Sequence, residues 1–183
     1  SIDNTKEAVA AIESMIHYPV EVLSDQAETY YGFLGVKKKE KLPQEGLLID
    51  IGGACLELTH FKDEKPIETH VLSIGSLTFY QNHVYELIPN ESEQKQMRQD
   101  IQSKYESIPW LKDKKIPEII AIGGSARALL RLTRELNRVP ISKTSTTLDQ
   151  DDVHKLSLLD IKASKMILKA APNRLITIVP AAI

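Results

Sequence analysis

The sequence predicts an α/β domain built on a mixed β-sheet, with an antiparallel meander and flanking helices. Three strand-like runs are joined by short turns, and a later buried strand stands between helical patterns. The strands are expected at 47–51, 55–61, 67–74 and 116–124, and the helices at 76–87, 91–107 and 125–137. This order suits a layered domain. Short turns between the first strands exclude a doubly wound parallel sheet, whose crossovers need a dozen or more residues.

The segment before the sheet predicts a helix followed by a short strand. Apolar residues recur at helical spacing within 4–18, where Asn4 is a candidate N-cap with Glu7 three residues later. Pro19 is expected to end this helix. The next four residues, VEVL at 20–23, have the composition of a strand.

A second helix is predicted over 24–36. Ser24 or Asp25 can cap it. The residues expected to form its apolar face are Ala27, Tyr30, Tyr31 and Leu34. A polar loop is expected at 37–46, and KDEK at 62–65 is expected to be the turn of a hairpin. Residues 140–147 are expected to form another loop. Two shorter helices are expected near 149–159 and 161–171, and a final apolar run follows at 173–183.

Composition excludes several classes of function. The chain has 183 residues, 42% of them hydrophobic, and a formal net charge of −2, so we expect no binding to nucleic acid or to a membrane surface. The basic run KKKEK at 37–41 is short and is interpreted as a solvated loop. A single cysteine excludes a disulfide framework and fits a reducing cytosol, so a cytoplasmic protein is expected. No apolar stretch approaches the ~20 residues that span a bilayer.

The stretch LLIDIGGACLEL at 47–58 predicts a site. Asp50 ends a strand, Gly52 and Gly53 allow a tight turn, and Glu57 on the returning strand can come back toward Asp50. Successive N–H groups in such a turn form a nest for an anion such as phosphate, and a divalent cation, usually Mg²⁺, would reconcile that anion with the acids. The same residues also fit a plain hairpin with a capping aspartate and a solvent-facing glutamate.

A second glycine turn, AIGGS at 121–125, ends the last predicted strand and opens a helix. Free N–H groups and the helix dipole make such a start an anion site, and Ser125 can cap the helix or bond a phosphate. Arg127 and Arg131 fall within the first two turns and can face the anion. Ordinary helix capping with surface arginines is the alternative.

Segments spread over nearly all of the chain carry a family resemblance. They read EVLSDQAETYYGFLGV (21–36), LLIDIGGACLEL (47–58), SIGSLTF (73–79), AIGGSARAL (121–129) and NRLITIVPAAI (173–183). In this order they resemble the exopolyphosphatase and guanosine pentaphosphate phosphatase family (Ppx/GppA), of the actin, sugar kinase and heat-shock ATPase superfamily. The first is similar to the family's Ser-Gly-x-Glu-Glu-Ala helix, and the second to its Asp-Ile-Gly-Gly-Gly-Ser-Thr-Glu loop. The resemblance implies a ribonuclease H-like (actin-like ATPase) fold.

The resemblance also implies roles. Glu28 matches the catalytic glutamate that orients or deprotonates the attacking water, whereas Asp50 and Glu57 match acids implicated in Mg²⁺ binding, with Glu57 also catalytic. The residues implied to bind phosphate are Gly52, Gly53, Ala54, Cys55, Gly123, Gly124, Ser125 and Arg127. Two alternatives remain open, namely that Glu28 only caps the helix with Asp25 and that Glu57 only faces solvent.

The sequence departs from the family pattern at the first glycine turn. Ala54 replaces the third glycine, Cys55 the serine and Leu56 the next small polar residue. A methyl group at Ala54 would hinder a left-handed backbone, and the lost hydroxyl removes a hydrogen bond to phosphate. Cys55 is interpreted as a small buried residue or a weak donor. Asp25 and Ala27 depart from the helix motif as well, so reduced activity is expected.

The resemblance divides the chain. Residues 1–23 are expected to be the tail end of a missing N-terminal domain, and 24–183 a second actin-like domain that is truncated at its C-terminus. The active site would lie between domains, so the fragment alone is expected to be inactive or nearly so. Release of terminal phosphate from inorganic polyphosphate is the first hypothesis for function. The alternatives are hydrolysis of guanosine pentaphosphate and a catalytically degenerate phosphate- or nucleotide-binding domain. The intact protein is a possible homodimer.

Histidine, cysteine and tryptophan residues yield no further site. The five histidines and the single cysteine show no spacing typical of metal ligands. Trp110, beside Pro109, is interpreted as a packing anchor rather than a base-stacking platform.

Overall fold

The computed structural model describes residues 4–112, 114–137, 146–158, 161–170 and 175–183. The helices are α1 (Thr5–Ile16), α2 (Asp25–Lys39), α3 (Ser76–His83), α4 (Glu91–Glu106), α5 (Gly123–Leu136), α6 (Gln150–Ser157), α7 (Ile161–Ala170) and α8 (Leu175–Ala182). The strands are β1 (Glu45–Ile51), β2 (Leu56–Lys62), β3 (Lys65–Leu72) and β4 (Ile119–Ile122). The predicted order of strands and helices from residue 47 is therefore confirmed.

The strands form one mixed sheet in the order β3-β2-β1-β4. β1 pairs antiparallel with β2, and β2 with β3, as the predicted meander requires, whereas β4 joins β1 in parallel. The predicted hairpin turn is confirmed, with Asp63 and Glu64 both at positive φ (49° and 58°). Turns of this kind match the twist of the two strands that they connect.

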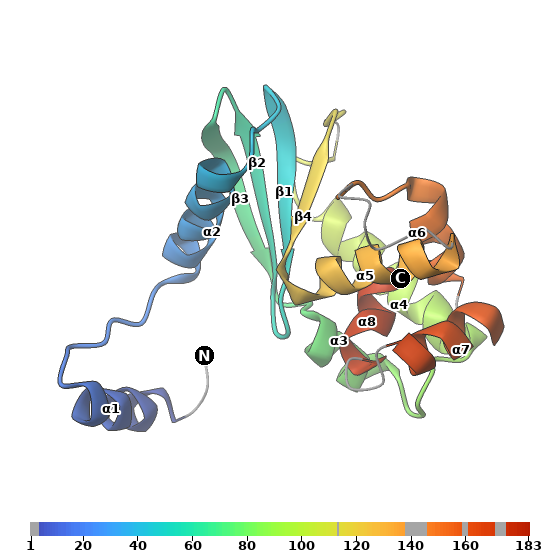
Figure 1. Ribbon diagram of the computed structural model, residues 1–183, viewed down its shortest axis with the longest axis horizontal. Coiled ribbons are helices and arrows are strands. Elements are labelled where there is room, and N and C mark those ends of the chain that lie inside the picture. The colour runs from blue at the N-terminus through green and yellow to red at the C-terminus, as the bar shows by residue number, and fades with distance from the viewer. Residues whose placement is uncertain (1–3, 113, 138–145, 159–160, 171–174) are drawn as a thin grey trace.

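Helices cover both faces of the sheet (Figure 1). Because side chains alternate along a strand, neighbouring leucines of β1 enter different cores. Leu48 packs with Phe33 of α2 and Phe61 of β2, and the two phenylalanine rings lie 5.7 Å apart. Leu47 faces the other way, into a larger core with α3 and α4. The strand thus separates a thin layer under α2 from the thick layer of helices opposite.

A further core joins α5, α6, α7 and α8. Its fully buried side chains include Leu132, Leu156, Ile167, Ile178 and Val179. The apolar run near the end of the sequence is therefore helical and packs inside this core. None of the helices in the described part of the chain combines the length and the apolar character that crossing a membrane demands.

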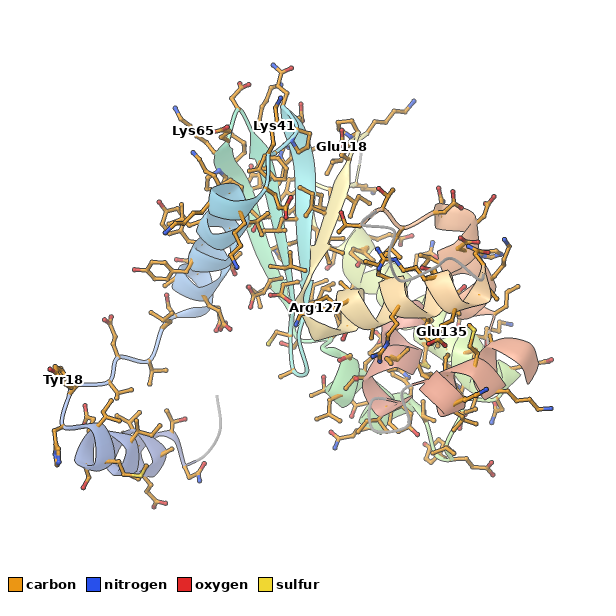
Figure 2. The ribbon with its side chains drawn as sticks, viewed as in Figure 1. Tyr18, Lys41, Lys65, Glu118, Arg127 and Glu135 are labelled. Carbon is orange, nitrogen blue, oxygen red and sulfur yellow. The ribbon has the colours of Figure 1, made fainter. Side chains whose placement is uncertain are left out.

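The predictions for the first segment were partly wrong. α1 forms, but the Asn4 side chain makes no capping hydrogen bond, and the helix ends at left-handed His17, before Pro19. Residues 20–23 form no strand, because no strand among the described residues pairs with them. They run as an extended connection between α1 and α2, where Val22 is 61% exposed. Tyr18, at the start of this connection, is also exposed (Figure 2).

The predicted apolar face of α2 was also wrong. Tyr30 and Tyr31 are 47% and 58% exposed, and Leu34 is exposed as well. The helix instead buries Thr29 and Phe33, because that side faces the sheet. Ser24 caps the helix, accepting from the Ala27 N–H, as one of the two predicted caps. The helix runs three residues further than predicted, to Lys39, and α3 stops four residues earlier, at His83.

Candidate active site

Two carboxylates face each other across the first hairpin. Asp50 lies near the end of β1 and Glu57 near the start of β2, and the two residues are direct partners in the antiparallel register. Side chains of such partners leave the same face of the sheet with Cβ atoms roughly 4.5–5.5 Å apart. The face is the one that α2 covers, since Asp50 and Glu57 alternate with the residues of the opposite core. Chain reversal thus brings Glu57 back to Asp50, as the hairpin prediction requires.

A cavity of about 240 Å³ lies at this place between α2 and the sheet. Its walls are Glu28, Thr29, Gly32, Leu48, Asp50, Glu57, Thr59 and Ile122. Three carboxylates from three separate elements therefore reach one cavity. Glu28 is in the first turn of α2, and the Ser24 side chain rather than Asp25 caps that helix, so the capping alternative for Glu28 is wrong.

Two threonines complete the polar lining. The Thr29 hydroxyl lies 3.1 Å from Glu57 Oε2, to which it can donate, and 2.8 Å from the carbonyl oxygen of Asp25. Thr59 is 2% exposed and comes from β2, two residues beyond Glu57 and on the same face. The Glu57 carboxylate is thus half-buried and hydrogen-bonded, so its alternative as a plain solvent-facing residue is wrong.

Burial and mutual repulsion disfavour negative charge in this cavity. Burial raises the pKa of the Asp50 carboxyl, the Glu28 carboxylate raises it further, and the Arg127 guanidinium partly offsets both. Burial also raises the pKa of Glu57, which the hydrogen bond from Thr29 lowers and the charges of Glu28 and Asp50 raise. A cation or a proton is therefore favoured among these acids, a pattern typical of functional sites.

The donor set fits Mg²⁺ but not a metal held by the protein alone. Among the described residues, no group of three or more histidine, cysteine, aspartate or glutamate side chains is arranged to hold a metal. Mg²⁺ commonly keeps several waters and is bound through one or two carboxylates plus phosphate oxygens. Asp50 and Glu57 supply such a pair.

The first glycine turn is packed against the start of α3. The carbonyl oxygens of Gly52, Gly53 and Ala54 accept hydrogen bonds of 2.8–2.9 Å from the N–H groups of Ser76, Leu77 and Gly75. A Cβ added to Gly75 would lie 2.2 Å from the Ala54 carbonyl carbon, so no larger residue fits at Gly75 without displacing the turn. The segment SIGSLTF therefore holds the turn in place.

The expected strain at Ala54 is absent. Among the described residues, positive φ outside glycine occurs only at His17, Asp63 and Glu64, so Ala54 has an ordinary backbone. The N–H groups of Gly53 and Ala54 make no hydrogen bond with the described part of the chain, and both residues are exposed. Cys55 is half-buried rather than fully buried, and burial raises the pKa of its thiol, with Asp25 adding to the effect.

The second glycine turn is built differently. α5 begins directly at Gly123, whose φ is +89°, and Ile122 at the N-cap makes no side-chain capping bond. A Cβ on Gly123 would lie 2.5 Å from Asp50 Oδ1, so this turn closes onto the first carboxylate. Ser125 lies inside the helix and is buried, so the prediction that it caps α5 was wrong.

A second hollow of about 220 Å³ lies along the start of α5. It is lined by Gly124, Arg127, Ala128 and Arg131. Arg127 projects where α5 leaves the sheet (Figure 2), close enough for its charge to act on Asp50. The structure therefore places three acids in one hollow and two arginines in another, and Gly123, at the start of the helix that carries the arginines, closes onto Asp50.

Sequence reasoning missed Thr29, Gly32 and Thr59. Their signals were weak but present, since Thr29 follows Glu28 directly and Thr59 shares the strand face of Glu57. Trp110 was predicted correctly as a packing anchor. Its ring stacks on buried His60 at 6.1 Å, at the end of β2 away from the carboxylates.

Comparisons with known proteins agree with this fold. The profile of the Ppx/GppA phosphatase family matches residues 1–183. A crystal structure of a Ppx/GppA family member from Aquifex aeolicus is similar at 20% identity and a TM-score of 0.77, covering 98% of this chain and 60% of that one. An exopolyphosphatase from Cytophaga hutchinsonii ATCC 33406 is similar at 18% identity and a TM-score of 0.81, covering 98% and 61%. The predicted actin-like ATPase fold is confirmed, and the chain spans about 60% of the length of these relatives.

Proposed function

This chain belongs to the Ppx/GppA phosphatase family, and on that premise we propose that it carries the acidic part of an active site for phosphoanhydride hydrolysis. The substrate we propose is inorganic polyphosphate, from which the intact protein would release terminal phosphate. The observation that carries this proposal is the convergence of Glu28, Asp50 and Glu57 on one cavity beside two glycine turns.

Each acid has a distinct position and hence a distinct proposed role. Glu28 stands on α2, opposite the sheet, and it is exposed at the cavity rather than tied down by a capping bond. In the reaction it would hold the attacking water and take its proton. Asp50 and Glu57 would bind Mg²⁺, which supplies neutralisation of charge on the phosphate oxygens when bound.

The phosphate would be held by backbone and arginine donors. Gly53 and Ala54 of the first turn are exposed, the start of α5 has no side-chain cap, and the charge of Arg127 acts on Asp50. Cleavage of a phosphoanhydride depends chiefly on positioning and electrostatics, so these parts suffice for the chemistry on this side of the substrate.

Two other functions compete with this one. Guanosine pentaphosphate has the same reacting bond, and its hydrolysis would use the same residues. A binding domain without turnover is favoured by Cys55 and Leu56, which remove two hydroxyls from the first glycine turn. The carboxylate cluster favours hydrolysis, because a site that only binds phosphate gains nothing from three acids beside it.

The test is phosphate release by the intact protein in the presence of Mg²⁺. Glu28→Gln is expected to lower kcat at least ~100-fold on long-chain polyphosphate, the range found for removal of a general base. Glu40→Gln, a glutamate at the other end of the same helix, is the matched control and should leave kcat unchanged. Faster turnover of guanosine pentaphosphate would favour the first rival, and no turnover of either substrate would favour the second.

A further inference from the structure

Thr29 and Thr59 line the cavity but have no part in the proposed mechanism, and of these two Thr29 contacts a carboxylate. Thr29 is 3% exposed and lies directly after Glu28 in α2. Buried helical threonines ordinarily donate to the carbonyl four residues back, and Thr29 does lie 2.8 Å from the Asp25 carbonyl oxygen. The same hydroxyl lies 3.1 Å from Oε2 of Glu57, which is 28 positions away on the sheet, so its single hydrogen is shared between these two acceptors.

This second contact crosses the cavity. At its far end α2 is tied to the hairpin by Lys37, whose ammonium lies 3.2 Å from a Glu64 carboxylate oxygen. In its middle α2 packs Phe33 on Phe61. Near the carboxylates, the side-chain hydrogen bond that the described residues make between α2 and the sheet is the one from Thr29 to Glu57. It therefore sets the place of Glu57 relative to Glu28.

Glu57 needs such a restraint. A glutamate side chain has several rotatable bonds, so fixing its carboxylate costs conformational entropy. Its neighbours Asp50 and Glu28 in the cavity are both acidic, so their charges repel the Glu57 carboxylate. A hydrogen bond to one oxygen, Oε2, holds the carboxylate in place and leaves Oε1 available. The family motif quoted above has alanine at this position, so the hydroxyl is a property of this chain.

We propose that Thr29 is a positioning residue that holds Glu57 for metal binding and thereby fixes its separation from Glu28. This inference rests on the proposed function of the site. Partners that orient a metal ligand typically contribute about 10- to 100-fold to metal affinity or activity. Thr29 never touches the substrate in this scheme, and it acts only through Glu57.

The test uses three variants of the intact protein. Thr29→Val keeps the shape but removes the hydroxyl, and Thr29→Ser keeps the hydroxyl. Thr133→Val is the matched control, because Thr133 is likewise buried in a helix and its hydroxyl donates to the Leu130 carbonyl oxygen, away from the carboxylates. The readouts are kcat and KM for polyphosphate with Mg²⁺, and the Kd for Mn²⁺ from the electron paramagnetic resonance signal of the free ion.

Thr29→Val is expected to weaken Mn²⁺ binding about 10-fold and to lower kcat about 10-fold, with KM within about twofold. Thr29→Ser should recover most of both, and Thr133→Val should change neither. Equal Mn²⁺ affinity in Thr29→Val and the parent would overturn the inference, as would a Thr29→Ser variant as defective as Thr29→Val. A parent that binds Mn²⁺ without turnover would refute the proposed function alone, and a parent that does neither would refute both.

Discussion

The two glycine turns of this domain have similar sequences but opposite surroundings. Residues 52–55 lead from β1 into a returning strand, and the carbonyl oxygens of the turn are bonded to the start of α3. Residues 123–125 form the start of α5 directly after β4, where no side chain caps the helix and Arg127 and Arg131 follow. The first turn stands beside acids and the second beside Arg127 and Arg131.

The element that follows each turn explains this difference. A strand that turns back brings Glu57 to face Asp50, which concentrates negative charge. A helix that starts at the turn presents a positive dipole end, which suits an anion. Since Gly123 closes onto Asp50, the two turns share a boundary, and a substrate phosphate with its metal would need both. Substitutions in the turns can therefore separate their contributions.

The largest effect is expected where the first turn meets α3. Gly75→Ala places a methyl group 2.2 Å from the Ala54 carbonyl carbon, so either the turn or α3 must move. We expect a loss of about 2–3 kcal/mol in the free energy of unfolding, typical of overpacking, measured by urea denaturation. Gly53→Ala is the control, because its methyl group would meet Leu77 Cβ at an ordinary 3.8 Å. Equal losses in both variants would contradict this account of the turn.

The second turn should depend on backbone conformation instead. Gly123→Ala forces alanine to φ +89° and drives a methyl group into Asp50 Oδ1. The expected cost is about 1–2 kcal/mol of stability, together with weaker Mn²⁺ binding because Asp50 must turn away. Gly35→Ala, in open space on α2, should instead be neutral or stabilising by up to about 1 kcal/mol. Unchanged Mn²⁺ affinity in Gly123→Ala would contradict the proposal that the second turn holds Asp50 in place for metal binding.

A smaller, pH-dependent effect is expected from the acids between the turns. Folding raises the pKa of Asp50 above its usual 3.8, so the folded protein holds this proton more tightly than the unfolded chain. The contribution of Asp50 to the free energy of unfolding is therefore greatest at low pH, and it falls as the pH rises from the unfolded pKa to the raised pKa of the folded protein. In metal-free buffer, Asp50→Asn should gain less than about 1 kcal/mol over the parent at pH 7 and nothing near pH 3. A gain that does not vary with pH would contradict the sign of this shift.

The smallest effect is expected at the departure from the family pattern. Ala54→Gly restores the third glycine of the motif, but Ala54 has no left-handed backbone to relieve. We expect a loss of about 0.5 kcal/mol, from added freedom in the unfolded chain, and little change in turnover. A large gain in activity would show that the methyl group, rather than the lost hydroxyls, limits the approach of phosphate.

Much of the candidate site could be predicted from local sequence patterns. Asp50 at a strand end, two glycines and Glu57 on the return strand form a short-range unit, whose geometry follows from strand alternation and a tight turn. The helix after the second glycine turn could be predicted from similarly local signals, although it starts at Gly123 and not at residue 125. Thr29 and Thr59 had only weak signals in the sequence, namely adjacency to Glu28 and the strand face shared with Glu57. The contact of Thr29 with Glu57 could not be predicted, because 28 residues separate the two along the chain.

The sequence by itself determined the order of the elements, the hairpin turn and the strand position of the two acids, since periodicity and turn chemistry act over a few residues. The tertiary structure alone decided which side of α2 is buried, that residues 20–23 remain unpaired and that β4 lies beside β1. The sequence pattern predicts that Tyr30 and Tyr31 are buried, but the side of α2 that packs on the sheet carries Thr29 and Phe33 instead. Burial and strand pairing depend on partners distant along the chain, and local patterns contain no information about where those partners lie.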